Sequence, residues 1–190
     1  MSPAWTLRTG RLRLIPVAWT DLADLTALKA DPRVFAVMLG GVRGPVQTAE
    51  ELAEDIRFWA ARGYGIWTIR DAATGAFQGL TGLMERPDGR GVALRFALWP
   101  EARGRGLARE AAGAALMFGH EQAGLPRIVA VARADNIASR TVLGGIGMTA
   151  AGGFLREGVE MVVYESTRAP RQVMRGAATP DTARWPPGRS

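Results

Sequence analysis

Two glycines and two arginines alternate where an apolar segment gives way to a helical pattern, in the stretch LRFALWPEARGRGLA at residues 94–108. Gly104 and Gly106 let the backbone approach a ligand closely, and the first turn of a helix offers unpaired N–H groups with partial positive charge. Arg103 and Arg105 add fixed positive charge. The pattern predicts a pyrophosphate-binding turn. A tight strand-to-helix turn without a ligand is the alternative interpretation.

Other nucleotide-binding motifs do not fit this stretch. A dinucleotide fingerprint would need glycine in place of Arg109, and a P-loop would need Gly-Lys followed by Ser or Thr. Farther along the chain, Asn136 and Ser139 are spaced to share one face of a helix. Their ordinary interpretations are a helix N-terminal residue and a solvated serine.

These two motifs together resemble the GNAT superfamily of N-acetyltransferases. Arg103, Gly106 and Ala108 match its Arg-x-x-Gly-x-Ala signature, and residues 136–148 resemble its Asn-x-x-Ser helix with the glycine that follows. The resemblance covers roughly residues 6–167 and is greatest to the branch that includes ribosomal-protein serine and alanine N-acetyltransferases. It implies a mixed α/β (α+β) fold, with a mostly antiparallel twisted sheet of about seven strands flanked by about four helices.

The resemblance also implies acetyl-CoA as co-substrate. Its pyrophosphate would bind the N–H groups of residues 103–108, and its pantetheine arm would pair with the strand backbone at 96–98 and with Asn136. Ser139 would lie near the thioester sulfur, where its hydroxyl could stabilise or protonate the thiolate. The implied cofactor-binding residues are Phe96, Ala97, Leu98, Arg103, Gly104, Arg105, Gly106, Leu107, Ala108, Asn136 and Ser139.

Two positions depart from the family's pattern. Many members have a tyrosine as general acid where this chain has Leu143, and the branch often has a glutamate where this chain has Ala93. The candidate catalytic residues are therefore Ser139 and Glu85, and a solvated surface carboxylate is the alternative interpretation of Glu85. An α-amine with a pKa of about 7.7 to 8.0 needs little help from a base, whereas lysine at about 10.4 needs more.

Hydrophobic periodicity and turn residues predict the elements that position these groups. Thr48 and Glu51 have the spacing of a capping box for one of the helices. We expect strands at 7–16, 65–70, 77–85, 92–99, 127–132, 148–154 and 158–166, and helices at 20–29, 49–62, 105–122 and 136–146.

Composition and chain length restrict the number of domains and the kinds of site and partner that the protein can have. A chain of 190 residues predicts one domain, assigned to 1–168, followed by a flexible tail at 169–190. The absence of cysteine excludes disulfides and a cysteine nucleophile, and the sole histidine, His120, leaves little material for a metal site.

The net charge is +6, of which the last 22 residues contribute +3, so we expect no nucleic-acid partner. No apolar run reaches the roughly 20 residues of a membrane span, and we expect a cytoplasmic protein.

The sequence thus predicts direct transfer of an acetyl group to an amine, either a protein N-terminus or a small molecule. A CoA-responsive binding module without turnover is a second hypothesis, because of Leu143 and Ala93. A nucleic-acid-binding protein is a third. The acceptor, the general base and the role of the tail are open, and so is the choice between a monomer and a homodimer.

Overall fold

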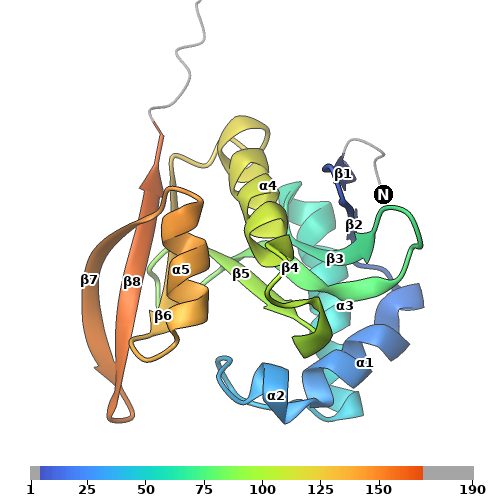
Figure 1. The fold of residues 1–190 in the computed structure, drawn as a ribbon, viewed down its shortest axis with the longest axis horizontal. Helices are drawn as coiled ribbons and strands as arrows, with labels where there is room; N and C mark the ends of the chain where they lie inside the picture. The colour runs from blue at the N-terminus through green and yellow to red at the C-terminus, as the bar shows by residue number, and fades with distance from the viewer. Residues whose placement is uncertain (1–4, 169–190) are drawn as a thin grey trace, which may run out of the picture.

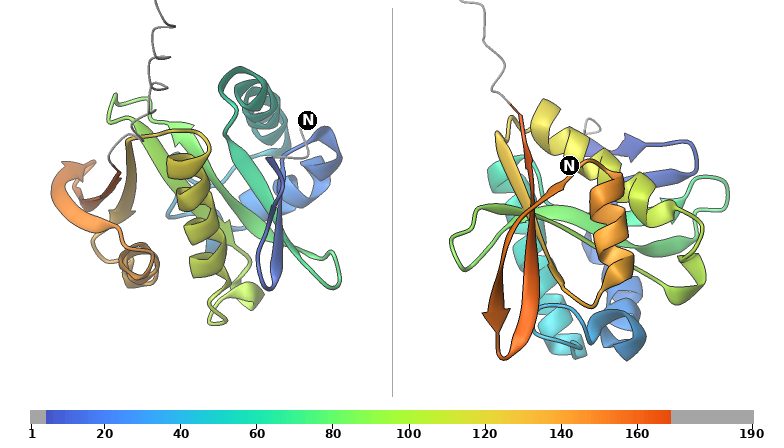
Figure 2. Two further views of the ribbon diagram at one scale, coloured as in Figure 1. Left: turned by 90° about the horizontal axis from the view of Figure 1, so that it is seen from above. Right: turned by 60° about the vertical axis from the view of Figure 1, so that its left-hand side comes forward.

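The computed structural model describes residues 5–168, which form one eight-stranded sheet with helices on both faces (Figures 1 and 2). The strand order is β1-β2-β3-β4-β5-β6-β8-β7. The strands are β1 (Leu7–Arg8), β2 (Leu12–Pro16), β3 (Ile66–Asp71), β4 (Phe77–Glu85), β5 (Val92–Leu98), β6 (Arg127–Arg133), β7 (Thr149–Arg156) and β8 (Val159–Thr167). The α-helices are α1 (Leu22–Ala30), α2 (Pro32–Phe35), α3 (Pro45–Arg62), α4 (Leu107–Glu121) and α5 (Ile137–Gly145).

Every neighbouring pair of strands is antiparallel except β5 and β6. These two are parallel because α4 crosses over between them. Their ladder holds a single register pair, Ala93 with Val129, so the sheet opens along the rest of β5. The predicted mixed fold with a mostly antiparallel sheet is confirmed. The described residues hold eight strands and five α-helices, because a two-residue strand and the short helix α2 add to the expected number.

The first predicted strand is two strands in the structure. Leu7 pairs with Leu14 across a turn in which the Thr9 N–H donates to the Leu12 carbonyl at 3.0 Å. The Glu110 carboxylate on α4 accepts hydrogen bonds from the Thr9 hydroxyl and the Arg11 N–H. A partner about a hundred residues away therefore holds the turn, and local alternation of apolar residues could not reveal it.

The predicted capping box at Thr48 and Glu51 is wrong. The helix α3 begins at Pro45, whose fixed φ suits the first helical position, and Gly44 is its N-cap. Thr48 therefore lies inside the first turn and is fully buried. The Glu51 carboxylate forms ion pairs with cations from neighbouring segments instead of capping the helix.

The core surrounds the middle of the sheet. The helix α4 covers one face together with α5, and α3 lies on the opposite face (Figure 2). Trp67 on β3 packs edge-on against Phe118 of α4, with ring centroids 5.2 Å apart. Trp59 and Trp67 are both fully buried and Tyr64 is nearly so. These three aromatic residues therefore belong to the core.

Candidate functional site

The glycine turn joins β5 to α4 through a short 3₁₀ turn at Pro100–Ala102. Gly104 and Gly106 have φ of +73° and +75°, a region that L side chains rarely adopt, so backbone conformation explains both glycines. A Cβ at Gly104 would meet no atom within 4 Å. Ala102 and Leu107 are buried at either end of the turn, whereas residues 103–106 are exposed. The predicted turn is therefore anchored at both ends and open to a ligand between them.

The two helices beside the opening of the sheet begin differently. Asn136 caps α5, because its side-chain oxygen accepts the Ser139 N–H at 3.1 Å. The N-cap of α4 is Gly106, and no side chain forms a capping hydrogen bond there. The first-turn N–H groups of α4 therefore stay available for an outside acceptor, and the helix dipole favours an anion.

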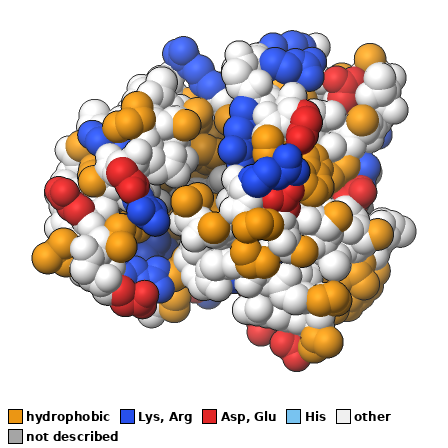
Figure 3. Space-filling model, turned by 60° about the horizontal axis from the view of Figure 1, so that its bottom comes forward, with side chains coloured by type: hydrophobic (Ala, Val, Ile, Leu, Met, Phe, Trp, Pro, Cys, Tyr) orange, Lys and Arg blue, Asp and Glu red, His pale blue; other side chains and the backbone are white. Residues whose placement is uncertain are grey.

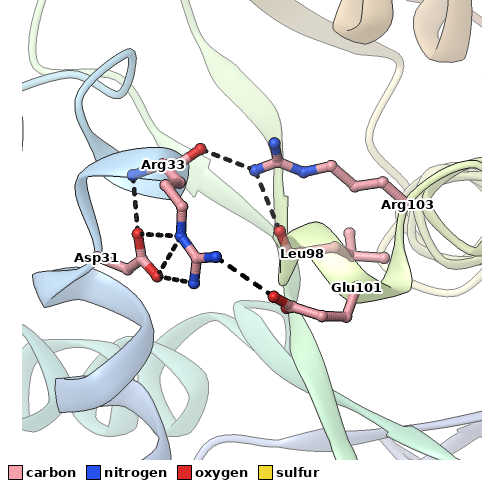
Figure 4. A network of polar contacts seen from close by, with 5 residues as sticks. All are labelled: Asp31, Arg33, Leu98, Glu101 and Arg103. Atoms are coloured by element: carbon pink, nitrogen blue, oxygen red, sulfur yellow. Dashed lines mark hydrogen bonds and ion pairs between the residues drawn. The ribbon is translucent and has the colours of Figure 1, made fainter.

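A polar network fixes the turn against α2 (Figure 4). The Arg103 guanidinium donates to the Arg33 carbonyl at 3.0 Å and to the Leu98 carbonyl at 3.4 Å. Arg33 in turn pairs with Asp31 at 2.6 Å and with Glu101 at 3.4 Å. Arg103 thus ties the end of β5 to the segment between α1 and α3. The sequence predicted only its charge and not this positioning role.

The strand segment Phe96–Leu98 lies along the opening between β5 and β6. Ala97 and Leu98 are buried, and β4 pairs with all three residues. On the side of β6 the ladder contains only the Ala93–Val129 pair. The segment therefore has a strand neighbour on one side, and an extended chain could lie along its other edge.

Ser139 lies half-buried in the first turn of α5. Its hydroxyl has no hydrogen-bond partner within residues 5–168, although its N–H is capped by Asn136. Leu143, one turn later, is buried in the core. A Cβ at Gly145 would come within 3.1 Å of the Arg109 side chain, so this arginine reaches from α4 to α5. Ser139 is thus the hydroxyl that the start of α5 offers to a ligand.

Glu85 lies away from the glycine turn. It pairs in register with Val92, at the opposite end of β5 from Leu98. Its carboxylate is about half exposed and forms an ion pair with Arg62 at 2.9 Å. A base at this position would have to act at the closed end of the opening between β5 and β6.

Sequence reasoning missed two charged residues on the face of the sheet opposite α4. They are Arg95 on β5 and Asp55 on α3, both half-buried. Burial raises the pKa of the Asp55 carboxyl to about 6, against the attraction of Lys29 and Arg95. Burial also lowers the pKa of Arg95, which Asp55 opposes. The sequence feature that could have indicated this charged pair is an arginine between Leu94 and Phe96, in an otherwise apolar strand.

Figure 3 turns forward the face at the bottom of Figure 1, where α2 lies. This face is hollowed between two parts of the molecule, and Lys and Arg side chains lie beside the hollow together with acidic ones. Within residues 5–168, no cluster of three or more His, Cys, Asp or Glu residues could hold a metal ion. None of the helices described in this range combines the length and the hydrophobicity of a membrane span.

Comparisons with known proteins agree with the fold. An acetyltransferase from Agrobacterium tumefaciens is 31% identical, with a TM-score of 0.75 over 86% of this chain and 94% of that one. A ribosomal-protein-S5-alanine acetyltransferase from Vibrio fischeri has the same fold at 14% identity, with a TM-score of 0.73 over 85% of this chain and 96% of that one.

A curated relative, the FsC-acetyl coenzyme A-N(2)-transacetylase of Aspergillus fumigatus, is 27% identical over 158 residues. The alignment covers 76% of this chain and 65% of the relative, so the chain spans slightly less than two thirds of that protein. The model of the acetyltransferase (GNAT) domain family matches residues 11–149, which include the whole glycine turn and the Asn136–Ser139 helix start. The chain therefore belongs to the GNAT family of acetyltransferases.

Proposed function

We propose that this protein transfers the acetyl group of acetyl-CoA directly to an amine, such as a peptide N-terminus or a small molecule. One observation carries the proposal. The uncapped N-terminus of α4, with Arg103 and Arg105 in the turn before it, lies at the end of a strand whose other edge is open. A pyrophosphate at the turn and an extended pantetheine arm along Phe96–Leu98 would satisfy both features.

In the proposed reaction the amine nitrogen attacks the thioester carbonyl carbon, a C–N bond forms and the C–S bond breaks. Backbone N–H groups of β5 stabilise the oxyanion, and the Ser139 hydroxyl donates a hydrogen bond to the leaving sulfur. The ammonium proton goes to solvent or to a nearby carboxylate. Glu85 is the carboxylate predicted from the sequence.

Calorimetric titration of acetyl-CoA tests the cofactor site. Arg105→Ala removes an exposed side chain in the turn, and Arg57→Ala removes an exposed arginine on α3 as the matched control. We expect micromolar binding to the wild type, weakened about three- to tenfold by Arg105→Ala because one charge-assisted contact is lost. The control should bind like the wild type. No binding to the folded wild type would overturn the proposal.

Turnover separates the enzyme from a CoA-responsive module. Because the chain has no cysteine, a thiol reagent added to the reaction reports released CoA alone. We expect release to depend on the added amine. Binding without release across a panel of α-amines, polyamines and lysine peptides would favour the binding module. A stoichiometric burst of CoA without any amine would contradict direct transfer.

A further inference from the structure

Arg95 points away from α4, toward the face of the sheet where α3 lies. Leu83 on β4 faces α4, since a Cβ at Gly119 of that helix would meet it at 2.7 Å. Leu94 is paired with Leu83 and so shares its face. Arg95 is the next residue of the strand, and its side chain therefore lies on the other face.

The surroundings of Arg95 on this face leave room for its side chain. Across the ladder it pairs with Gly82, which has no side chain, and its same-face neighbours on β5 are Ala93 and Ala97. The long aliphatic part of the Arg95 side chain therefore lies over small residues. Asp55 and Glu51 of α3 and Arg43 before it are among the charges whose fields reach the guanidinium.

The Arg95 guanidinium has no hydrogen bond and no ion pair within residues 5–168. Asp55 also lacks such a partner in the same part of the chain. An arginine carries five N–H donors in a planar fork, and a half-buried fork that is left unpaired is costly. By contrast, the neighbouring Arg43 and Arg86 each hold a carboxylate at 2.6 Å. Arg95 therefore has the donors for an outside acceptor.

The Glu51 carboxylate already forms ion pairs with two cations. It accepts from Lys29 at 2.7 Å and from Arg43 at 2.6 Å, and both of these cations are largely buried. Together with Arg95 and Asp55 the cluster holds three cations against two carboxylates, and the fields of Glu54 and Arg86 add one charge of each sign. Burial also disfavours the charged form of Asp55. The field around Arg95 thus favours an anion and disfavours a polycation.

Arg95 immediately precedes Phe96, the start of the segment along which the sheet opens. Under the proposed function the thioester lies along this segment, with the α5 groups on the face of α4. An acceptor that approaches from the α3 face reaches the thioester past Arg95. The arginine is therefore placed to contact the part of the acceptor beside its amine.

We propose that Arg95 binds a carboxylate of the acceptor, so that the preferred substrate is an amine carrying an acidic group close to its nitrogen. Free amino acids and peptides with an acidic residue after the N-terminus share this chemistry. The inference rests on the proposed function, and it narrows the acceptor from any amine to an anionic one. A bidentate pair between guanidinium and carboxylate is the interaction that selects it.

Steady-state turnover on matched acceptors tests this selection. Alanine is compared with alaninamide, and the peptide Ser-Asp-Ala with Ser-Asn-Ala, both peptides amidated at the C-terminus, so that each pair differs by one carboxylate. Rates are expressed per unprotonated amine, because the carboxylate also raises the pKa of the amine. For the wild type we expect kcat/KM to be about tenfold or more higher for the acidic member of at least one pair. The pair that shows the difference distinguishes a free amino acid from a peptide. Spermidine, a polycation, should be poorer than either acidic acceptor.

Arg95→Gln should remove the preference by raising KM for the acidic acceptor and leaving the neutral one within about twofold. Arg95→Lys should keep part of the preference, because it keeps the charge without the fork. Arg57→Gln, an exposed change on α3, should behave like the wild type. A purely structural role of Arg95 would instead lower turnover equally on both members of a pair.

Equal rates for acidic and neutral acceptors with the wild type would overturn the inference, and so would faster acetylation of spermidine. This comparison uses the wild type alone, so poor folding of an Arg95 variant would not affect it. Acetyl-CoA binding is measured in the same preparation by calorimetry. If acetyl-CoA binds and neutral amines are acetylated equally well, only the inference fails. If acetyl-CoA does not bind, the proposed function fails with it.

Discussion

At the scale of single residues, Ser139 combines a half-buried position with a hydroxyl that has no partner in the described part of the chain. Its N–H, in contrast, is capped by Asn136 at 3.1 Å, so the helix start is stable without the hydroxyl. The side chain can therefore change with little effect on folding. This separation of stability from chemistry makes Ser139 the cleanest position for a kinetic test.

We expect Ser139→Ala to lower kcat about 10- to 100-fold, because the proposed hydrogen bond to the leaving sulfur would be lost. The Kd for acetyl-CoA should change less than about threefold, and Ser139→Thr should keep part of the rate. Steady-state kinetics and calorimetry on the folded variants check this. An unchanged kcat in Ser139→Ala would remove Ser139 from the reaction.

The Asp55 carboxyl determines a pH dependence of stability. Its folded-state pKa lies above the ordinary value of 3.8, at about 6, because of burial and the like charges of Glu51 and Glu54, against attraction by Lys29 and Arg95. The folded state therefore binds the proton more tightly than the unfolded chain does. This contribution to stability is present below about pH 4 and is lost as the pH rises through about 6.

Asp55→Asn should consequently raise the free energy of unfolding near pH 8 by about 1 kcal/mol, after allowing for solvent screening of a half-exposed group. Near pH 4 the gain should disappear. Urea unfolding at both pH values measures it, with the exposed Glu54→Gln on the same helix as control. A gain of equal size at both pH values would mean that ionisation is not its cause.

At the scale of elements, the position where α3 begins decides the surroundings of Thr48. Because the helix starts at Pro45, the Thr48 side chain is fully buried, and its hydroxyl has no partner within residues 5–168. Burying an unsatisfied hydroxyl costs about 1–3 kcal/mol. Valine has nearly the same shape without that cost.

Thr48→Val should therefore stabilise the protein by about 1 kcal/mol. Thr81→Val is the matched control, because Thr81 is also fully buried but donates to the Arg95 carbonyl at 2.9 Å. That variant should lose stability instead. Thermal and urea unfolding of both variants decide the point, and a destabilised Thr48→Val would show that its hydroxyl has a partner in solution.

At the scale of the whole molecule, the β6–β8–β7 part joins the rest of the sheet through the single Ala93–Val129 register pair and through helix contacts. The Arg168 N–H donates to the Pro126 carbonyl at 2.9 Å, and its guanidinium pairs with Glu121 at 2.8 Å. These bonds hold the last described residue. The predicted tail at 169–190 lies outside the described residues.

We propose residues 1–168 as the folding unit. A chain ending after Arg168 should unfold within about 2 °C of the full chain, a shift that corresponds to at most about 1 kcal/mol. It should also bind acetyl-CoA equally well. A chain ending after Gly158 loses β8, which pairs with both β6 and β7, and should not fold. Calorimetry decides between these outcomes, and weakened acetyl-CoA binding in the 1–168 chain would extend the domain beyond Arg168.

The sequence by itself determined the features that depend on neighbours along the chain. Gly104 and Gly106 specify positive φ, and the helical pattern after them specifies where N–H groups become available, so the turn between β5 and α4 was predicted. The family resemblance, now confirmed by the match at residues 11–149, supplied the mixed sheet. Short-range geometry suffices for such features because each depends on a few consecutive residues.

The tertiary structure alone decided which distant side chains meet. Arg95 and Asp55 are forty positions apart, and only the packing of α3 over β5 brings their charges into one half-buried cluster. The hairpin at Thr9 and the start of α3 were likewise set by contacts or backbone geometry that apolar periodicity does not record. Burial changes the free energy of a charge, and burial is a property of the packed chain, so the charge cluster beside the sheet opening could not be predicted from spacing.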